Sequence, residues 1–224
     1  MSRVFSDDHI YRNLTIALAL LLILSPIMDH LFPSSRIDSY LTVAFLVFAL
    51  FEITRQTSDL LIGLGLGIPA VVGSIFNAAT PDTPATNLGP TIFAGLFLGF
   101  LVYRILRDIS VSSRLSAEKI FGAVCAYLLI GFLFSSVYVF IALVDPDAFT
   151  YSEVLASTLE SSPRGQGVFT YFSFVTMSTL GYGDISPVSA AARSCAWIQA
   201  VLGQLYIAIT IAALVGAHVA RGRD

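Results

Sequence analysis

A segment that reads TMSTLGYGD contains two glycines separated by one residue, Gly181 and Gly183. Glycine reaches backbone dihedrals that other residues resist, so alternating glycines allow a strand to turn successive carbonyl oxygens toward one axis. Rings of such carbonyls can replace the water that a potassium ion loses on entering a membrane. Thr179 adds a hydroxyl at the inner mouth of the strand. Leu180 and Tyr182 are expected to point away from the axis and brace the strand.

The composition of the chain predicts a lipid bilayer as its surroundings. Of 224 residues, 56% are hydrophobic and 12% are charged, and the mean hydropathy is +0.81. A soluble domain carries about a quarter charged residues. The net charge of −3 comes without a basic block, so no nucleic-acid partner is expected. The sequence contains no recognisable nucleophile–base pair, metal cluster or phosphate loop, so neither an enzyme nor an organic cofactor is indicated.

Six apolar runs are candidates for transmembrane helices, since a crossing takes about 20 mostly apolar residues. They cover residues 14–28, 40–53, 60–79, 88–106, 120–144 and 191–219. Glycines and Pro69 in the third run predict close helix contacts and a kink. A shorter apolar run, 168–178, is followed at once by glycines and predicts a helix that enters and returns. The predicted fold class is an all-α membrane protein with six transmembrane helices and a re-entrant pore helix.

The distribution of basic residues predicts the orientation of these helices. With both ends inside, the inner segments hold nine basic residues and the outer segments hold three. The inner residues are Arg3, Arg12, Arg55, Arg104, Arg107, Arg114, Lys119, Arg221 and Arg223, and the outer ones are Arg36, Arg164 and Arg193. Because basic residues favour the cytoplasmic side, both termini are expected in the cytoplasm and the re-entrant loop is expected to face outward.

The glycine-containing segment resembles the selectivity filter of the tetrameric potassium-channel family, whose pattern is Thr-Val-Gly-Tyr-Gly. The match holds at Thr179, Gly181, Tyr182 and Gly183, and Leu180 stands in place of valine. The resemblance implies that these five residues bind K⁺. It also implies that the chain forms a homotetramer around one pathway for passive K⁺ conduction.

The resemblance continues on both sides of the filter. Asp184 matches the acidic residue that commonly follows it and is implied to fix its outer end. Tyr171 and Phe172 stand where the family often carries an aromatic cuff. This divides the chain into a four-helix N-terminal membrane domain of unknown role, residues 1–112, and a pore domain, residues 113–224. The stretch after the filter looks like bacterial members of the family, so we expect the chain in the plasma membrane of a bacterium.

Two residues of the last apolar run are candidates for the cavity and gate. Gly203 stands where the family often has a hinge glycine, and a close-packing contact is the alternative. Gln204 is a polar group in an apolar run, which predicts either a cavity-lining residue or an inter-helix hydrogen bond. Both alternatives stay open for each residue.

The fourth apolar run does not have the pattern of a voltage sensor. Its only arginines, Arg104 and Arg107, lie at its cytoplasmic end before Asp108, and residues 88–103 carry no charge. A sensor needs several arginines at every third position, each worth about 2.3 kcal/mol per 100 mV. Weak or absent voltage dependence is therefore predicted. Glu52 can pair with either arginine at the inner boundary.

Two rival functions stay open. One is a poorly selective cation channel, against which Tyr182 argues because such channels often replace it. The other is a non-conducting scaffold or transporter subunit. A transporter normally shows polar breaks in two related halves, and the sequence has no matching half. The sequence indicates neither the opening stimulus nor a regulatory partner.

Overall fold

A computed structural model describes residues 10–31, 37–54, 60–79, 84–111, 117–153, 155–156 and 166–221. The helices of this described part are α1 (Ile10–Leu31), α2 (Ile37–Thr54), α3 (Leu60–Ala79), α4 (Pro84–Val111), α5 (Ala117–Val144), α7 (Gln166–Met177) and α8 (Ala190–Arg221). Two short strands, β1 (Phe149–Tyr151) and β2 (Ile185–Pro187), pair in antiparallel fashion. The fold is therefore all-α except for this strand pair, which the sequence analysis did not predict.

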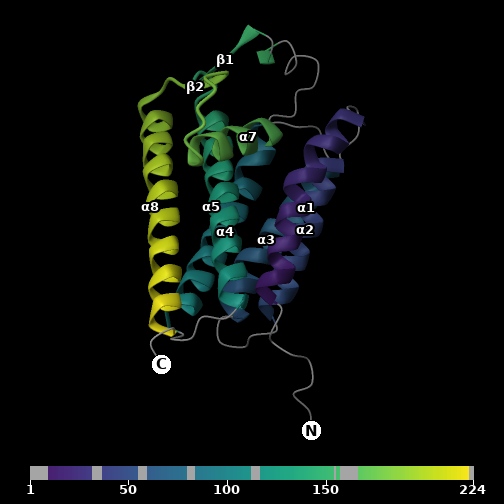
Figure 1. Cartoon of the computed structure of the whole chain (residues 1–224). Coiled ribbons are helices and arrows are strands. Elements are labelled where there is room, and N and C mark those ends of the chain that lie inside the picture. Colours follow the sequence, from purple (N-terminus) through teal and green to yellow (C-terminus); the bar gives the residue numbers. More distant parts are fainter. Residues whose placement is uncertain are drawn as a thin grey trace.

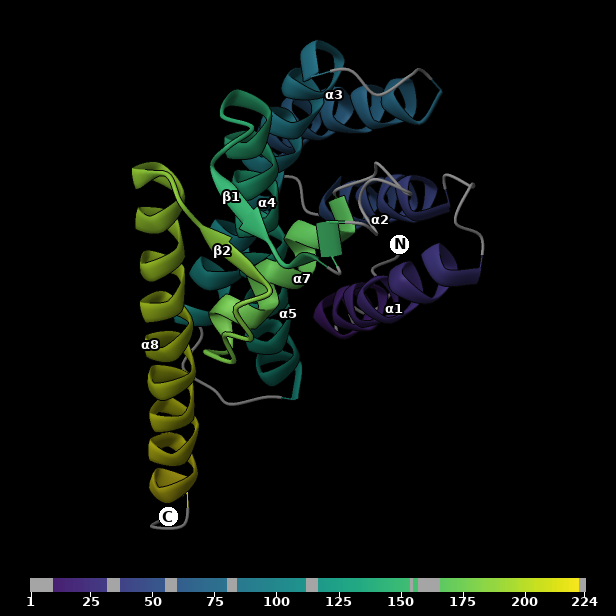
Figure 2. The same ribbon diagram turned by 90° about the horizontal axis from the view of Figure 1, so that it is seen from above.

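The long helices form a bundle with α5 at its centre. Helix α1 packs against α2 and α5, α3 packs against α2 and α4, and α4 packs against α5. On the other side of α5, the short helix α7 lies between α5 and α8. Seen from above, α1 and α2 lie on one side of α5 and α8 lies on the opposite side (Figure 2). Helix α5 therefore connects the first four helices to the C-terminal region.

Two apolar clusters stabilise the bundle. The larger one joins α1 to α5, and its fully buried side chains include Leu18, Leu46, Phe97 and Leu129. The smaller one joins the C-terminal half of α5 to β1, α7, β2 and α8, with Tyr138 fully buried. Between helices that lie in lipid, such clusters are stabilised by close van der Waals packing, because the lipid chains are as apolar as the side chains. Helix α5 contributes to both clusters.

Glycines in α3 allow close helix contacts, as the sequence predicts. A Cβ placed on Gly67 would lie 2.7 Å from the Leu50 side chain of α2. A Cβ on Gly73 would lie 2.7 Å from the ring of Pro90 in α4. Small residues at such crossings let helix backbones approach each other. Gly65 has no such neighbour within 4 Å.

Four of the described helices are long and apolar enough to cross a membrane. Their candidate spans are Ile10–Met28, Asn87–Ser110, Glu118–Val144 and Ala190–Ala213. The apolar stretches of α2 and α3, Tyr40–Glu52 and Leu60–Phe76, are shorter. That the chain crosses the membrane six times therefore stays a prediction.

Several helix boundaries differ from those expected from the sequence, and α3 alone begins and ends where its apolar run does. Helix α1 continues to Leu31, beyond the expected end at residue 28, and α4 begins at Pro84, before the expected start at residue 88. A helix does not have to end where its apolar run ends, because backbone hydrogen bonds continue through polar residues. Proline is accepted at the first helical position, where no amide hydrogen is required.

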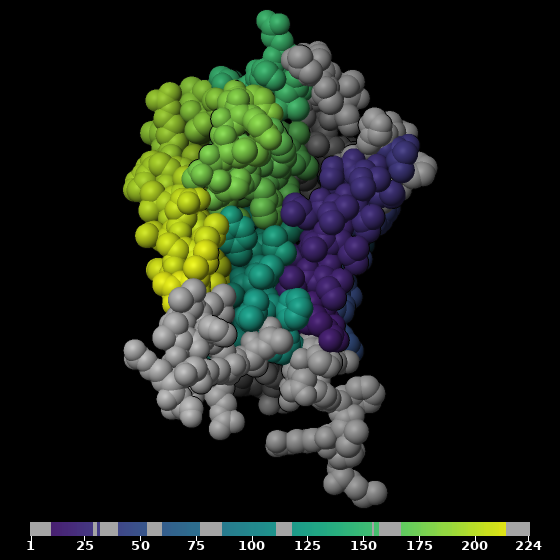
Figure 3. Space-filling model, viewed as in Figure 1, coloured from purple at the N-terminus to yellow at the C-terminus, as the bar shows by residue number. Residues whose placement is uncertain are grey.

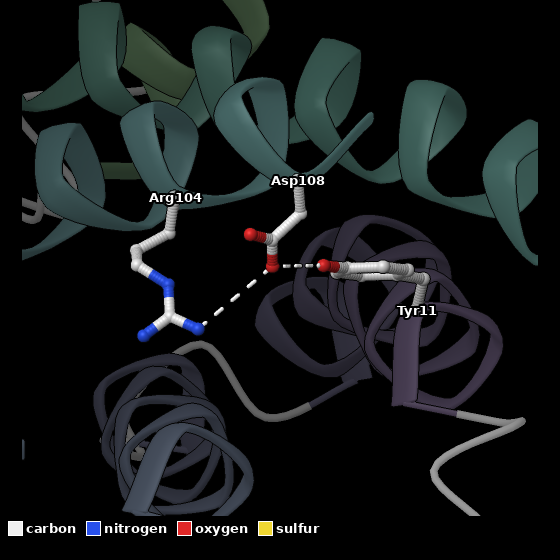
Figure 4. A network of polar contacts seen from close by, with 3 residues as sticks. All are labelled: Tyr11, Arg104 and Asp108. Carbon is white, nitrogen blue, oxygen red and sulfur yellow. Dashed lines mark hydrogen bonds and ion pairs between the residues drawn. The ribbon is translucent and has the colours of Figure 1, made fainter. Parts of the chain in front are cut away.

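The start of α1 and the end of α8 lie at the same end of the bundle, opposite α7 and the strand pair (Figure 1). At that end, the Tyr11 hydroxyl donates a hydrogen bond to Asp108 Oδ2 at 2.7 Å. A guanidinium nitrogen of Arg104 lies 3.8 Å from the same oxygen (Figure 4). Arg104 and Glu52 are both buried, whereas Arg107 is exposed. The predicted pairing of Glu52 with an arginine stays a prediction.

Candidate ion-coordinating segment

Helix α7 ends in a Schellman motif immediately before the predicted filter. The Leu180 amide donates to the Val175 carbonyl, and the Thr179 amide donates to the Thr176 carbonyl, both at 3.0 Å. The left-handed position of this motif is usually glycine. Thr179 takes it instead, with φ of 59°, although a β-branched residue is strained there. Thr179 therefore occupies a backbone conformation that glycine would adopt at less cost.

Left-handed backbone recurs at every second residue of the segment. After Thr179 at 59°, Gly181 has φ of 58° and Gly183 has φ of 79°. The glycines adopt this conformation at little steric cost, as the sequence predicts, whereas the positive φ of Thr179 was not foreseen. A Cβ placed on either glycine would meet nothing within 4 Å in the single chain. The requirement for glycine in this chain is therefore conformational and not a matter of space.

The side chains expected to brace the segment are open in the single chain. Leu180 is 54% exposed and Tyr182 is 67% exposed. Figure 3 shows α7 and the segments next to it at the surface of the chain, between α8 and α1. Any packing that braces these two side chains therefore comes from outside the single chain.

Asp184 connects the outer end of the segment to its surroundings. Its Oδ2 accepts a hydrogen bond from the Tyr171 hydroxyl at 2.7 Å, and its Oδ1 accepts one from the Ile185 amide at 3.1 Å. Its carbonyl accepts a hydrogen bond from the Ser152 amide at 2.8 Å, next to the β1–β2 pair in which Tyr151 is opposite Ile185. The segment is therefore tied at its outer end to both α7 and a strand.

The Tyr171 phenol is a donor over the whole physiological pH range. Desolvation, together with the hydrogen bond to Asp184 and the charge of that carboxylate, raises the pKa of Tyr171 to about 12. A neutral phenol can donate to the carboxylate, whereas a phenolate cannot. This contact is therefore stable until strongly alkaline pH.

Phe172, the second residue of the expected cuff, lies in a different environment from Tyr171. It is buried, and its ring centroid lies 4.9 Å from Tyr138 and 5.6 Å from Phe149 in edge-on contacts. Phe149 makes a further edge-on contact with Phe169 at 5.0 Å. Edge-on aromatic pairs add directional contact to apolar burial. Phe172 thus packs one side of α7 against α5 and β1, whereas the Tyr171 hydroxyl reaches Asp184 at the C-terminal end of the segment.

A buried polar chain behind α7 was missed by the sequence analysis. The Tyr138 hydroxyl donates to Gln199 Oε1 at 2.6 Å. Gln199 Nε2 donates to Ser173 Oγ at 2.7 Å and to the Ser173 carbonyl at 3.1 Å. Ser173 Oγ donates to the Gly131 carbonyl at 2.6 Å. Gln199 is a polar residue in an apolar run, which is the same signal that singled out Gln204.

Helix α8 passes close to the end of α7 at Gly203. A Cβ placed there would lie 2.6 Å from both the carbonyl oxygen and Cγ of Met177. This is the close-packing contact that the sequence left open, while the hinge stays a prediction. Gln204 is exposed on the single chain. Three residues beyond Gly203, the Tyr206 hydroxyl donates to the Ala123 carbonyl of α5 at 2.7 Å.

Comparison with known families places this region in a functional class. Residues 124–219 match the family model described as an ion channel. The matched residues include most of α5, all of α7, the segment at 179–183 and nearly all of α8. Comparisons with curated proteins and with solved structures found no match. The match covers less than half of the chain, and it points to a channel and not to an enzyme.

Proposed function

We propose that the chain is a subunit of a potassium-selective channel and that residues 179–183 are its selectivity filter. The observation that carries this proposal is the left-handed backbone at Thr179, Gly181 and Gly183, directly after a short helix. With Leu180 and Tyr182 between them, these residues are proposed to offer their backbone carbonyls, and Thr179 its hydroxyl, to conducted K⁺.

The functional unit is proposed to be a homotetramer, because one strand supplies only one side of a coordination shell. The exposed Leu180 and Tyr182 support this, since a second copy would cover them. Helix α8 also exposes a long series of large apolar side chains. They are Trp197, Ile198, Val201, Leu202, Leu205, Ile207, Ile209 and Ile211. In a tetramer, part of this face packs against neighbouring copies and part contacts lipid.

The channel is proposed to lie in the plasma membrane, the inner membrane of a bacterium, with six crossings and both termini in the cytoplasm. The location of the α1 start and α8 end at one end of the bundle supports an even number of crossings. Helices α2 and α3 are then spans with short apolar stretches whose polar ends lie in the headgroup region.

Conduction in this proposal is passive diffusion through a backbone held at both ends. The Schellman motif fixes the inner end at Thr179, and the bonds of Asp184 fix the outer end. The C-terminus of α7 precedes the segment, and its partial negative charge favours a cation there. Ions must bind well enough to enter and weakly enough to leave, and several sites in line allow both. The opening movement involves α8, the filter itself, or both.

The test compares Gly181→Ala with Gly65→Ala. Both sites have open space for a Cβ, but Gly181 has φ of 58° whereas Gly65 lies in a helix. Alanine in the left-handed region costs roughly 1–2 kcal/mol per residue. In liposomes containing the purified protein, we expect K⁺ flux that exceeds Na⁺ flux in the wild type and in Gly65→Ala. This selective flux should be lost in Gly181→Ala.

A second readout does not depend on an open gate. A K⁺ ion bound in the filter stabilises the folded tetramer by mass action, so the melting temperature of the wild type should be higher in K⁺ than in Na⁺. Gly181→Ala should lose this difference. Equal K⁺ and Na⁺ flux would indicate a non-selective cation channel. Absence of both flux and K⁺-dependent stabilisation would leave a non-conducting scaffold or transporter subunit.

A further inference from the structure

Gln199 is the most deeply buried polar side chain of α8 among the described residues whose exposure is defined. It is 0% exposed, as are Tyr138 of α5 and Ser173 of α7, with which it is hydrogen-bonded. Each of the three side chains comes from a different helix around the back of the filter. A buried amide is stable only when its donors and acceptor are satisfied. Both amide hydrogens and the amide oxygen of Gln199 are hydrogen-bonded here.

We propose that Gln199 is a positioning residue for ion selection. In this inference, which rests on the proposed function, its amide holds Ser173 in place and thereby sets the position of the Thr179 end of the filter. Gln199 itself does not contact the conducted ion. Its effect is transmitted through α7.

The hydrogen-bonding capacity of each group determines the orientation of the amide. The Ser173 carbonyl can only accept, so it must face the NH₂ group of Gln199. Ser173 Oγ donates its hydrogen to the Gly131 carbonyl and therefore accepts the second hydrogen of that NH₂ group. The amide oxygen of Gln199, Oε1, then accepts a hydrogen bond from the Tyr138 hydroxyl. Hydrogen-bond donation therefore runs in a single direction, from Tyr138 through Gln199 and Ser173 to the Gly131 carbonyl.

The hydrogen bonds of Gln199 are directional, whereas the apolar packing around α7 is not. Phe169 and Phe172 already bury one side of α7 in the smaller apolar cluster. Apolar burial alone tolerates small sliding and rotation, because it is non-directional. Two hydrogen bonds to Ser173 from one planar amide restrict both movements, and buried polar networks of this kind specify a single arrangement.

The restraint at Ser173 reaches the filter through two carbonyls on the following turn. The Val175 and Thr176 carbonyls accept the amides of Leu180 and Thr179. The next side chain, the Phe174 ring, fills the space over Gly131 of α5, where a Cβ would lie 2.5 Å from the ring. Helix α7 is therefore held against both α5 and α8 within one turn of the filter. A shift at Ser173 changes the position of the first ion-coordinating residue.

The experiment uses the full-length channel with Gln199→Met, which keeps the length of the side chain and removes the amide. We expect the ratio of K⁺ to Na⁺ permeability in liposomes to fall roughly tenfold, equivalent to about 1.4 kcal/mol. Tyr138→Phe, which keeps the ring and removes only the hydroxyl, should lower the ratio in the same direction by less. This milder variant also serves where Gln199→Met fails to assemble.

Two matched controls remove similar groups elsewhere. Ser136→Ala removes a hydroxyl that donates to the Phe132 carbonyl within α5 itself. Tyr103→Phe removes a hydroxyl from an exposed tyrosine of α4. Both are expected to keep the wild-type permeability ratio. A loss of selectivity in the controls equal to that in Tyr138→Phe would contradict the proposed role.

Gln199→Glu gives a readout that a purely structural role would not produce. A protonated carboxyl has one donor and one acceptor, so it can accept from Tyr138 and keep one of the two hydrogen bonds to Ser173, whereas a carboxylate has no donor for Ser173. Burial raises the pKa of a carboxyl, so we expect the selectivity of Gln199→Glu to fall as the pH rises from about 5 to about 9. The wild type and Gln199→Met control for the titration of Tyr138 and Cys195. Equal selectivity of Gln199→Glu and Gln199→Met at every pH would overturn the proposal.

Hydrogen exchange separates this inference from the proposed function. Backbone amides of residues 175–183 should exchange faster in Gln199→Met and Tyr138→Phe than in the wild type and both controls. A wild type without K⁺ selectivity overturns the proposed function, whereas this exchange difference still reports on Gln199. Unchanged exchange in Gln199→Met overturns the positioning role, whatever the wild type conducts.

Discussion

The region around α7 and the four-helix region α1–α4 are stabilised in different ways. Behind α7, the polar side chains Tyr138, Gln199 and Ser173 are fully buried and hydrogen-bonded between three helices. In the described part of α1–α4, large apolar side chains form most of the core, close crossings occur at Gly67 and Gly73, and the charged side chains of Glu52 and Arg104 are buried as well. The polar contact of Tyr11 with Asp108 lies at the end of the bundle.

This difference indicates what each region has to achieve. Apolar packing keeps helices together but restricts their sliding less than directional hydrogen bonds do. An ion-coordinating backbone must be held at a defined position, which requires directional bonds from several elements. The left-handed Thr179 is further support, since backbone strain persists only where the surroundings enforce it.

The largest expected effect compares two buried phenylalanines. Phe97 is 0% exposed in the core of α1–α5, and Phe172 is 6% exposed behind the filter. Replacing either by alanine leaves a cavity and should cost about 3–5 kcal/mol of stability. We expect both variants to melt at lower temperature. Only Phe172→Ala should also lower the ratio of K⁺ to Na⁺ permeability, because Phe172 fixes the back of α7.

Thermal melting and liposome flux on the same preparations check this expectation. Phe97→Ala is the matched control, since it removes the same ring at similar burial from the other region. Loss of selectivity in Phe97→Ala as large as in Phe172→Ala would show that the two regions are coupled. The distinction between anchor and filter support would then be wrong.

The next effect concerns two glycines with different surroundings. A Cβ on Gly203 would lie 2.6 Å from the Met177 carbonyl oxygen, which belongs to the backbone and cannot move aside easily. We expect Gly203→Ala to destabilise the channel by about 1–3 kcal/mol through overpacking. Gly65→Ala, with open space on a helix, should be neutral or stabilise by up to about 1 kcal/mol.

The same pair distinguishes close packing from a hinge at Gly203. Melting temperature and open probability are measured for both variants. A lower melting temperature in Gly203→Ala supports the packing contact. An unchanged melting temperature with a reduced open probability would mean that Gly203 serves as a hinge and that the contact with Met177 adjusts at little cost.

The sequence was most informative about features that depend on local backbone conformation. The alternating glycines at 181 and 183 predicted the left-handed positions, and the apolar run 168–178 predicted α7 to within two residues at its start. These features are local, so the chemistry of a few neighbouring residues determines them. The apolar runs likewise located the long helices, since helix formation in a membrane depends mainly on local composition.

The features that the sequence did not reveal depend on contacts between distant segments. Gln199 and Gln204 give the same local signal, but only the packed helices show that Gln199 is buried against Ser173 and that Gln204 is exposed. The pairing of β1 with β2 joins three-residue strands that are too short for a recognisable alternation. Thr179 was assigned an ion-binding role, but its strained φ follows from the helix end that precedes it.

A smaller effect is expected at the outer end of the filter. Tyr171→Phe removes the hydroxyl that donates to Asp184, at a net cost of about 0.5–1.5 kcal/mol. Tyr103→Phe, on the exposed face of α4, is the control and should be neutral. Melting in K⁺ should show the larger decrease for Tyr171→Phe, because this contact ties Asp184 to α7.

The effect of Tyr171→Phe should not vary between about pH 6 and pH 9. Desolvation and the bond to Asp184 raise the pKa of Tyr171 to about 12, above its ordinary value of 10. A raised pKa means that the contribution is fully present below about pH 10 and is lost as the pH rises through about 12. A difference between wild type and variant that disappears within pH 6–9 would contradict this assignment of the donor.

The smallest expected effect is at Arg107, in the four-helix region. Arg107 is exposed near the C-terminal end of α4, and residues 88–103 of the same helix carry no charge. A charge that crossed the whole field would contribute about 2.3 kcal/mol per 100 mV to gating. Arg107 starts at the membrane boundary, so we expect Arg107→Gln to leave the slope of the conductance–voltage relation unchanged. Recordings from planar bilayers at both polarities check this, with the wild type beside the variant. A shallower slope in Arg107→Gln would mean that α4 moves its inner end through the field, and the four helices would then act as a sensor and not only as an anchor.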